Sequence, residues 1–134
     1  LVGSNPTADV WELAGADVHV TGYVSDEVLE DYYARCRVAV APLRFGGGMK
    51  GKGLESMRHG LPMVTTPVGV QGLAAATFLP HSDDAATLAD EICRLLADDR
   101  YWRQVSRAST DFIAGNYSVQ ALWQVLEAQL QADR

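Results

Sequence analysis

Residues 38–66 read VAVAPLRFGGGMKGKGLESMRHGLPMVTT and carry most of the information about the fold. They open with a continuous apolar run over residues 38–42, which is typical of a strand covered on both faces in a parallel sheet. A glycine-rich loop occupies residues 45–51, and a short amphipathic helix then ends at Gly60, with a proline two positions beyond it. A second apolar run follows over residues 63–66. The order strand, loop, helix, strand predicts a parallel β–α–β unit and therefore an α/β fold.

The same alternation continues on both sides of this segment. Asn5 is expected to cap a helix that starts at Pro6, and Ser25 to cap a second helix with two acidic residues in its first turn. Further strands are expected at residues 1–3, 18–22 and 77–79.

Three apolar stripes at helical spacing fill the C-terminal part of the chain. A cap at Asp83 or Asp84 precedes the first stripe, and a cap at Ser118 precedes the third. We predict a Rossmann-like parallel sheet flanked by helices, as a single domain over residues 1–134. The extra C-terminal helices would pack on the sheet or reach toward a part that the chain lacks. The stripes comprise Leu88, Ile92, Leu95 and Leu96; Trp102, Val105 and Phe112; and Leu122, Val125, Leu126 and Leu130.

Length and composition limit the class of protein. The chain has 134 residues, 48% of them hydrophobic and 21% charged, which fits one globular domain. Its net charge of −6 disfavours a nucleic acid partner, because such binding depends on Lys and Arg contacts to phosphates. No apolar run approaches the roughly 18 residues of a membrane span, and no secretory signal is visible. We therefore expect neither a nucleic acid partner nor a transmembrane segment.

The cysteines and histidines give no sign of a disulfide or a metal site. Cys36 and Cys93 are far apart, and each is expected to be a small buried hydrophobe. His19, His59 and His81 are scattered, whereas a metal site needs clustered ligands. These features favour the reducing cytoplasm. Because the chain starts with leucine at what looks like a strand end, we expect it to be a piece of a longer protein.

The loop over residues 44–52 is the candidate binding segment. Its glycines let the backbone approach a ligand, and the N-terminus of the next helix adds N–H donors and partial positive charge. This combination predicts a phosphate or pyrophosphate site; a flexible connection with solvated lysines is the alternative. Neither common phosphate signature is present, since a glycine follows Lys52 and no G-x-G-x-x-G follows the first strand. The net charge over residues 44–58 is +3, from Arg44, Lys50, Lys52 and Arg58 against Glu55.

Residues 48–66 resemble the donor-site segment of retaining group 1 glycosyltransferases of the GT-B fold. The C-terminal domains of that family carry a pattern of the form G-x-x-x-L-E-A-M-A-x-G-x-P-V-V-x-T. The flanking residues 20–24, 38–42 and 79–84 are similar as well, and the resemblance extends from Leu1 to about Leu126.

This resemblance implies that the chain is the C-terminal, nucleotide-sugar-binding half of a two-domain enzyme. The donor would be a UDP- or GDP-sugar, and the missing N-terminal domain would bind the acceptor. Such enzymes resemble one another in needing no bound metal or other cofactor. The full-length protein would be cytoplasmic or peripheral at the inner face of the membrane, and the isolated chain would bind nucleotide weakly without catalysis.

The resemblance also assigns roles to individual residues. Glu55 matches the glutamate that holds the ribose hydroxyls, and Lys50 or Lys52 would neutralise charge on the leaving diphosphate. The loop glycines would turn N–H groups toward the donor sugar or its phosphates. Tyr23 and Val24 match a turn near the base, although core packing explains them equally well. No catalytic residue is assigned. The positions carried over are Gly46, Gly47, Gly48, Lys50, Lys52, Glu55, Tyr23 and Val24.

One departure from the family pattern keeps other functions open. Many members have a glutamate that touches the donor sugar eight positions before the ribose-binding one, and this chain has Gly47 there. The departure favours a non-catalytic nucleotide-binding or interaction domain. A nucleotide-sugar epimerase of the same fold is the other alternative. His59, one residue before the end of its helix, is expected to complement the helix dipole rather than act in catalysis.

Overall fold

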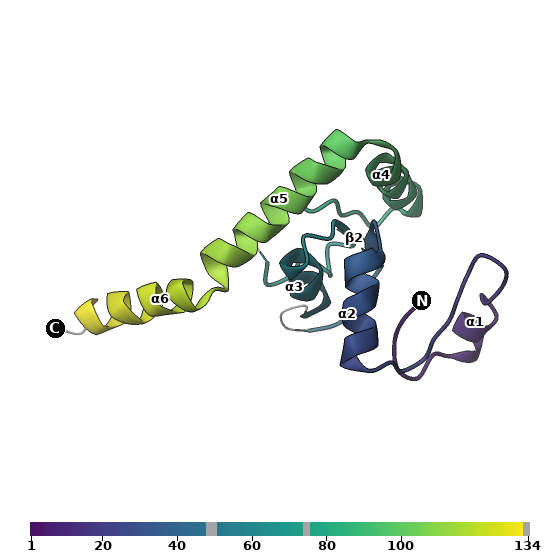
Figure 1. Ribbon diagram of the computed structural model, residues 1–134, viewed down its shortest axis with the longest axis horizontal. Coiled ribbons are helices and arrows are strands. Elements are labelled where there is room, and N and C mark those ends of the chain that lie inside the picture. Colours follow the sequence, from purple (N-terminus) through teal and green to yellow (C-terminus); the bar gives the residue numbers. More distant parts are fainter. Residues whose placement is uncertain (48–50, 74–75, 133–134) are drawn as a thin grey trace. The chain divides into compact units, whose positions relative to one another are not determined.

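The computed structural model describes residues 1–47, 51–73 and 76–132 (Figure 1). The chain forms two compact units, Leu1–Arg35 and Cys36–Arg134. The first unit contains α1 (Ala8–Trp11) and α2 (Asp26–Arg35). The second contains, in chain order, β1 (Ala39–Ala41), α3 (Gly51–Arg58), β2 (Met63–Thr65), α4 (Ala85–Ala97), α5 (Asp99–Asn116) and α6 (Val119–Ala132).

The two strands form a parallel pair joined through α3. In this pair Ala39 lies opposite Met63, and Ala41 lies opposite Thr65. The predicted β–α–β unit and the α/β fold class are therefore confirmed. One further parallel bridge joins Thr65 to His81.

The strand predicted over residues 77–79 is wrong. The backbone N–H of Leu79 donates to the carbonyl of Ala76 at 3.1 Å, so these residues close a turn. The side chain of Leu79 is buried in the core although the residue lies in a turn. Its apolar character therefore reflects core packing rather than a strand. The bridge to β2 forms two positions later, at His81.

The first unit pairs its N-terminal residues with residues 19–22 but forms no regular strand within residues 1–35. The Thr21 N–H donates to the carbonyl of Leu1 at 3.1 Å, and the Gly3 N–H donates to that of Gly22 at 3.2 Å. The N-terminal ammonium donates to the His19 carbonyl at 2.6 Å. The predicted strands at residues 1–3 and 18–22 are thus wrong as regular elements, although the backbones do run in parallel contact.

Of the two helix caps predicted in the first unit, one is confirmed and one is wrong. α2 begins directly after Ser25, whose Oγ lies 3.5 Å from the N–H of Val28, and this cap is confirmed. The cap at Asn5 is wrong. Asn5 has φ 54°, a left-handed conformation that turns the chain, and Thr7 in extended conformation precedes α1 instead.

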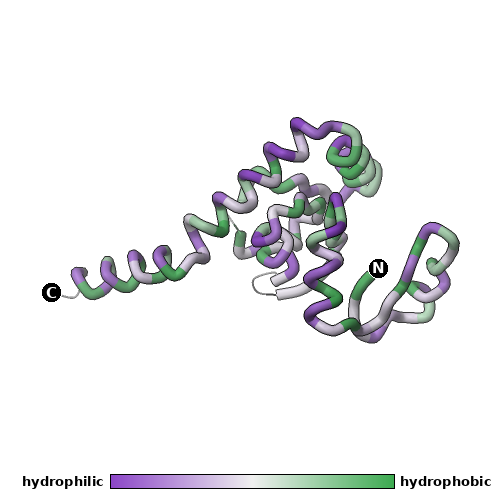
Figure 2. The backbone as a smooth tube through the Cα atoms, in the orientation of Figure 1, coloured by the Kyte–Doolittle hydropathy of each residue, from purple (hydrophilic) through white to green (hydrophobic). Residues whose placement is uncertain are grey.

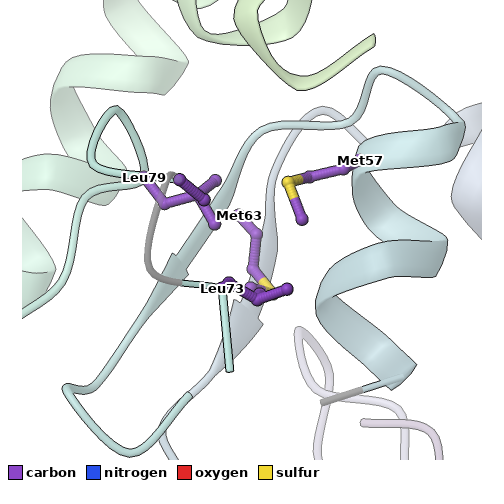
Figure 3. Packing of buried hydrophobic residues seen from close by; sticks show 5 residues of the cluster. Met57, Met63, Leu73 and Leu79 are labelled. Atoms are coloured by element: carbon purple, nitrogen blue, oxygen red, sulfur yellow. The ribbon is translucent and has the colours of Figure 1, made fainter. Parts of the chain in front are cut away.

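Two clusters of buried side chains form the core, and both lie within the second unit. One cluster gathers Met57 of α3, Met63 of β2, Leu73 and Leu79 (Figure 3). The other joins Val64 of β2 to α4 and α5 through Leu95 and Val105. The strand β2 therefore contributes to both clusters, to the one with α3 through Met63 and to the one with α4 and α5 through Val64.

The C-terminal helices differ in how much they bury. The inner stripe of α4 is buried or half-buried at Leu88, Ile92 and Leu95, and Asp84 caps the helix as predicted. Leu96 does not belong to that stripe, because it is exposed. The predicted stripe of α5 is likewise buried or half-buried at Trp102, Val105 and Phe112.

α6 is different, because its large apolar residues are exposed. Ser118 caps the helix as predicted, with its Oγ 3.1 Å from the Ala121 N–H. Figure 2 shows hydrophobic residues recurring along the helix. The predicted stripe is exposed throughout, at Leu122, Val125, Leu126 and Leu130.

The expectation that both cysteines are buried is wrong. Cys36 and Cys93 are exposed. Cys93 lies on the outer side of α4, next to but not within the inner stripe that Ile92 and Leu95 form, and Cys36 follows the last residue of α2.

Candidate functional site

The glycine-rich loop leaves the sheet at the end of β1. The Leu43 N–H donates to the carbonyl of Ala41 at 2.9 Å, which closes a tight turn around Pro42. The chain then passes into solvent, with Phe45 86% exposed. Gly46 has φ 143°, a backbone conformation that favours glycine. The predicted site residues Gly46 and Gly47 thus lie in an exposed loop, whereas Gly48 and Lys50 fall outside the described residues.

α3 presents two of the predicted site residues on one side. Lys52 and Glu55, three positions apart, are both exposed. The opposite side, with Gly53, Ser56 and Met57, is buried. Gly53 allows close packing there, since a Cβ at this position would lie 3.2 Å from the side chains of Leu73 and Met63. The amphipathic packing of α3 therefore turns the carboxylate of Glu55 and the ammonium of Lys52 to solvent.

The end of α3 is fixed by a glycine. Gly60 has φ 63°, its N–H donates to the Met57 carbonyl at 3.0 Å, and the Leu61 N–H donates to the Ser56 carbonyl at 3.0 Å. This pair of bonds is the Schellman arrangement, and it confirms the predicted helix end. The buried Ser56 hydroxyl also donates to the Leu61 carbonyl at 2.7 Å. These contacts hold the helix that carries Glu55 in one orientation.

Two threonines at the end of β2 are structural features that the sequence analysis missed. The Thr65 hydroxyl donates to the Ala41 carbonyl at 2.6 Å, and the Thr66 hydroxyl donates to the Leu43 carbonyl at 2.5 Å. Both bonds reach the segment from which the glycine-rich loop departs. A pair of threonines after an apolar run was the only signal in the sequence, and such β-branched residues are ordinary in strands.

Two other predicted candidates belong to the unit that does not contain α3. Tyr23 and Val24 belong to the unit Leu1–Arg35. Tyr23 is 79% exposed, so core packing does not explain it, and Val24 is half-buried. His59 is half-buried with its Nε2 3.4 Å from Nη2 of Arg58.

A shallow surface hollow lies elsewhere, along α5. Within the part of the chain that the structure describes, every residue that lines it comes from this single helix. It is therefore a shallow depression on a basic face of one helix, not an enclosed binding pocket. The lining residues are Arg100, Arg103, Gln104, Arg107, Ala108 and Asp111.

Comparison with protein families matches a region that contains the β1–α3–β2 unit. A family model described as "Glycosyl transferases group 1" matches residues 1–98, which is more than half of the chain. The chain belongs to the group 1 glycosyl transferases. Searches of curated proteins and of solved structures returned no match.

The match shows which part of this group 1 glycosyl transferase is shared with the family model. It includes β1, α3 and β2 and ends one residue after α4. The helices α5 and α6 lie beyond it, and they include the exposed apolar residues of α6. None of the helices in the described ranges has the combination of length and apolar character that crossing a bilayer requires.

The residues exposed on α3 of this glycosyl transferase can contribute three kinds of interaction. A carboxylate such as that of Glu55 accepts two hydrogen bonds at once, which suits a pair of adjacent hydroxyls. The Lys52 ammonium offers positive charge to an anion. The first turn of α3 and the preceding glycine-rich loop can offer backbone N–H donors, because the first N–H groups of a helix have no partner within it.

Proposed function

We propose that the chain binds the nucleoside diphosphate of a sugar donor, as the C-terminal half of a two-domain GT-B enzyme that transfers the sugar to an acceptor. One observation carries the proposal: within the matched region, α3 turns Lys52 and Glu55 together to solvent just after the glycine-rich loop. Ligands of open parallel α/β sheets bind beyond the carboxyl ends of the strands, which is where this loop and the start of α3 lie.

In this proposal each group has a distinct task. Glu55 accepts hydrogen bonds from the two ribose hydroxyls of a UDP- or GDP-sugar. Lys52 stabilises the charge that develops on the leaving diphosphate. Gly46 and Gly47 let backbone N–H groups approach the donor. The tasks given to Gly48 and Lys50 by resemblance, and to Tyr23 and Val24 near the base, stay predictions of the same proposal, as does a cytoplasmic location.

A titration of UDP and GDP into the isotope-labelled chain tests the role of Glu55. We expect amide signals within residues 46–55 to shift, and Glu55→Gln to weaken binding about tenfold or more, because a charged hydrogen-bond acceptor is lost. A 2′,3′-dideoxy nucleotide should bind as weakly to the original chain as the normal nucleotide binds to the variant. The variant should lose less affinity than the original chain does when the dideoxy nucleotide replaces the normal one, since only a neutral acceptor remains to lose its partners.

The matched control is Glu127→Gln, which removes the same charge from an exposed position on α6. It should leave nucleotide affinity unchanged. If Glu55→Gln and the dideoxy nucleotide weaken binding independently, so that their effects multiply, Glu55 does not hold the ribose and its assignment is wrong.

A second function, nucleotide binding without transfer, is favoured by Gly47. This residue offers no side chain where many family members place a donor-sugar glutamate. A Cβ added to Gly47 would meet nothing within 4 Å, so the described fold would accept a side chain there. The full-length protein with a panel of radiolabelled nucleotide sugars separates the functions. Transfer supports the proposal, binding without turnover supports the second function, and sugar interconversion supports an epimerase.

A further inference from the structure

Two consecutive threonines join the end of β2 to the root of the glycine-rich loop. Thr65 is fully buried and Thr66 is 7% exposed. Their hydroxyls donate to carbonyls two residues apart, Thr65 to Ala41 at 2.6 Å and Thr66 to Leu43 at 2.5 Å. Valine has nearly the same shape but no hydroxyl, so these two bonds are what threonine adds at either position.

The two bonds differ in what they hold. Thr65 acts within the sheet, because it pairs with Ala41 in the strand register and its own N–H and carbonyl bond to Pro80 and Ser82. Gly69 packs against it so closely that an added Cβ would lie 1.8 Å from the Thr65 Oγ1. The Thr65 hydroxyl therefore adds one more contact to a residue that is already fixed.

Thr66 acts beyond the last pair of the sheet. Its partner, Leu43, lies after the tight turn at Pro42 and three residues before Gly46, whose φ of 143° directs the loop. The Leu43 N–H donates to the Ala41 carbonyl at 2.9 Å, and the Leu43 carbonyl accepts from the Thr66 hydroxyl. Both backbone polar groups of Leu43 are therefore hydrogen-bonded. Beyond Leu43 the chain is exposed up to Gly47.

We propose that Thr66 is a positioning residue: its hydroxyl fixes Leu43 and thereby sets the path of residues 44–47, the described start of the loop that leads to the proposed donor-phosphate site. The inference rests on the proposed function, since it assigns Thr66 to the same nucleotide site. Thr66 does not touch the nucleotide. It lowers the conformational freedom that the loop must lose when the ligand binds.

The test compares Thr66→Val, which keeps the shape and removes the hydroxyl, with Thr66→Ser, which keeps the hydroxyl. The control is Thr110→Val on α5, where the hydroxyl also donates to a backbone carbonyl, that of Arg107. Two quantities are measured in each variant: hydrogen exchange of the Leu43 amide with ¹⁵N relaxation of Gly46 and Gly47 in the free chain, and the dissociation constants of UDP and GDP.

We expect Thr66→Val to raise the exchange rate of the Leu43 amide and the mobility of both glycines. It should raise the dissociation constant about tenfold, because nucleotide binding must then order part of the loop that the hydroxyl had already fixed, while the shifts of Glu55 on nucleotide addition are retained. Thr66→Ser and Thr110→Val should behave as the original chain. Where Thr66→Val loses the dispersed amide spectrum of a folded protein, Thr66→Ala replaces it and is compared with Thr66→Ser in the same way.

Three results overturn the inference or the proposal beneath it. Original affinity in a folded Thr66→Val or Thr66→Ala variant overturns the positioning role. Failure of Thr66→Ser to restore affinity does so too, since the hydroxyl would then not be the cause. A chain that binds neither UDP nor GDP overturns the proposed function, whereas the exchange and relaxation measurements still decide whether Thr66 holds the loop.

Discussion

Gly60 occupies a position that only glycine fits without strain. Its φ of 63° is left-handed, and an added Cβ would lie 3.1 Å from the Ser106 Oγ and 3.2 Å from the Thr110 Cγ2 of α5. The residue therefore meets two separate demands, a reversal of the chain at the end of α3 and close contact between α3 and α5.

We predict that Gly60→Ala lowers the free energy of unfolding by about 1–3 kcal/mol. The left-handed conformation alone costs a residue with a Cβ roughly 1–2 kcal/mol, and the tight contacts with α5 add to that. Urea unfolding followed by circular dichroism measures the change.

Gly115→Ala is the matched control, because this glycine lies within α5 and an added Cβ meets nothing within 4 Å. Alanine should stabilise that helix slightly, by about 0.5–1 kcal/mol or less near its end. Equal destabilisation by both substitutions would show that the conformation and contacts of Gly60 are not the cause.

At the scale of single residues, the sequence pattern predicted features that depend only on neighbouring residues. The helix end at Gly60 follows from a glycine placed before a proline. The bond from Thr66 to Leu43 could not be predicted in this way. Its partner is 23 residues away in the sequence, and the partner atom is a backbone carbonyl, which every residue has.

Among the elements, α4 and α5 meet at a junction with several side-chain contacts. Asp98 ends α4 and also caps α5, where its carboxylate accepts from the N–H groups of Arg100 and Tyr101 at 2.9 and 3.0 Å. The Tyr101 hydroxyl donates to Glu91 at 2.8 Å, and the guanidinium of Arg94 lies 3.7 Å from the centre of the Tyr101 ring. Burial, with the nearby Glu91 carboxylate, raises the pKa of Tyr101 to about 12.

The capping carboxylates make the stability of α4 and α5 depend on pH. The bond from the Tyr101 N–H is the main cause that lowers the pKa of Asp98 below its ordinary 3.8, and the bond from the Thr87 N–H does the same for Asp84. A lowered pKa in the folded state means that the cap stabilises the protein fully above the unfolded pKa. That contribution is lost as the pH falls through the folded pKa.

We therefore predict that Asp98→Asn flattens the loss of stability below about pH 4. The amide oxygen of asparagine can still accept the two capping bonds but does not titrate. Urea midpoints measured from neutral pH down to about pH 3 should fall less steeply for the variant than for the original chain. Asp90→Asn, at a carboxylate of α4 that caps no helix, is the control. If the urea midpoint of Asp98→Asn falls with pH as steeply as that of the original chain, titration of the Asp98 cap is not a cause of the acid sensitivity.

The elements were predictable where a capping residue and an apolar stripe coincided. Ser25, Asp84 and Ser118 each precede a helix as predicted. Asn5 failed because asparagine also tolerates the left-handed conformation that it adopts here. The strand at residues 77–79 failed because a short apolar run is equally compatible with a turn whose side chains enter the core.

For the whole chain, the core is concentrated in the second unit. Every buried member of the two hydrophobic clusters, and every half-buried side chain packed against them, comes from Cys36–Arg134. In the first unit the one buried residue is Gly22, which has no side chain to contribute. The alternation of strands and helices predicted the α/β class correctly. It could not predict this uneven burial, because apolar spacing does not say which partner a face will meet.

Residues 36–134 alone should therefore keep their fold. All the packing around Met57, Met63 and Val64 stays when residues 1–35 are removed, and hydrophobic burial is the main stabilising term of a domain. We expect the shortened chain to unfold cooperatively in urea, with the amide shifts of residues 57–73 and 95–109 close to those of the full chain. Residues 1–35 alone should give the narrow amide spectrum of an unfolded peptide. Collapse of the dispersed spectrum in residues 36–134 would contradict the prediction, because the first unit would then supply apolar contacts that the core depends on.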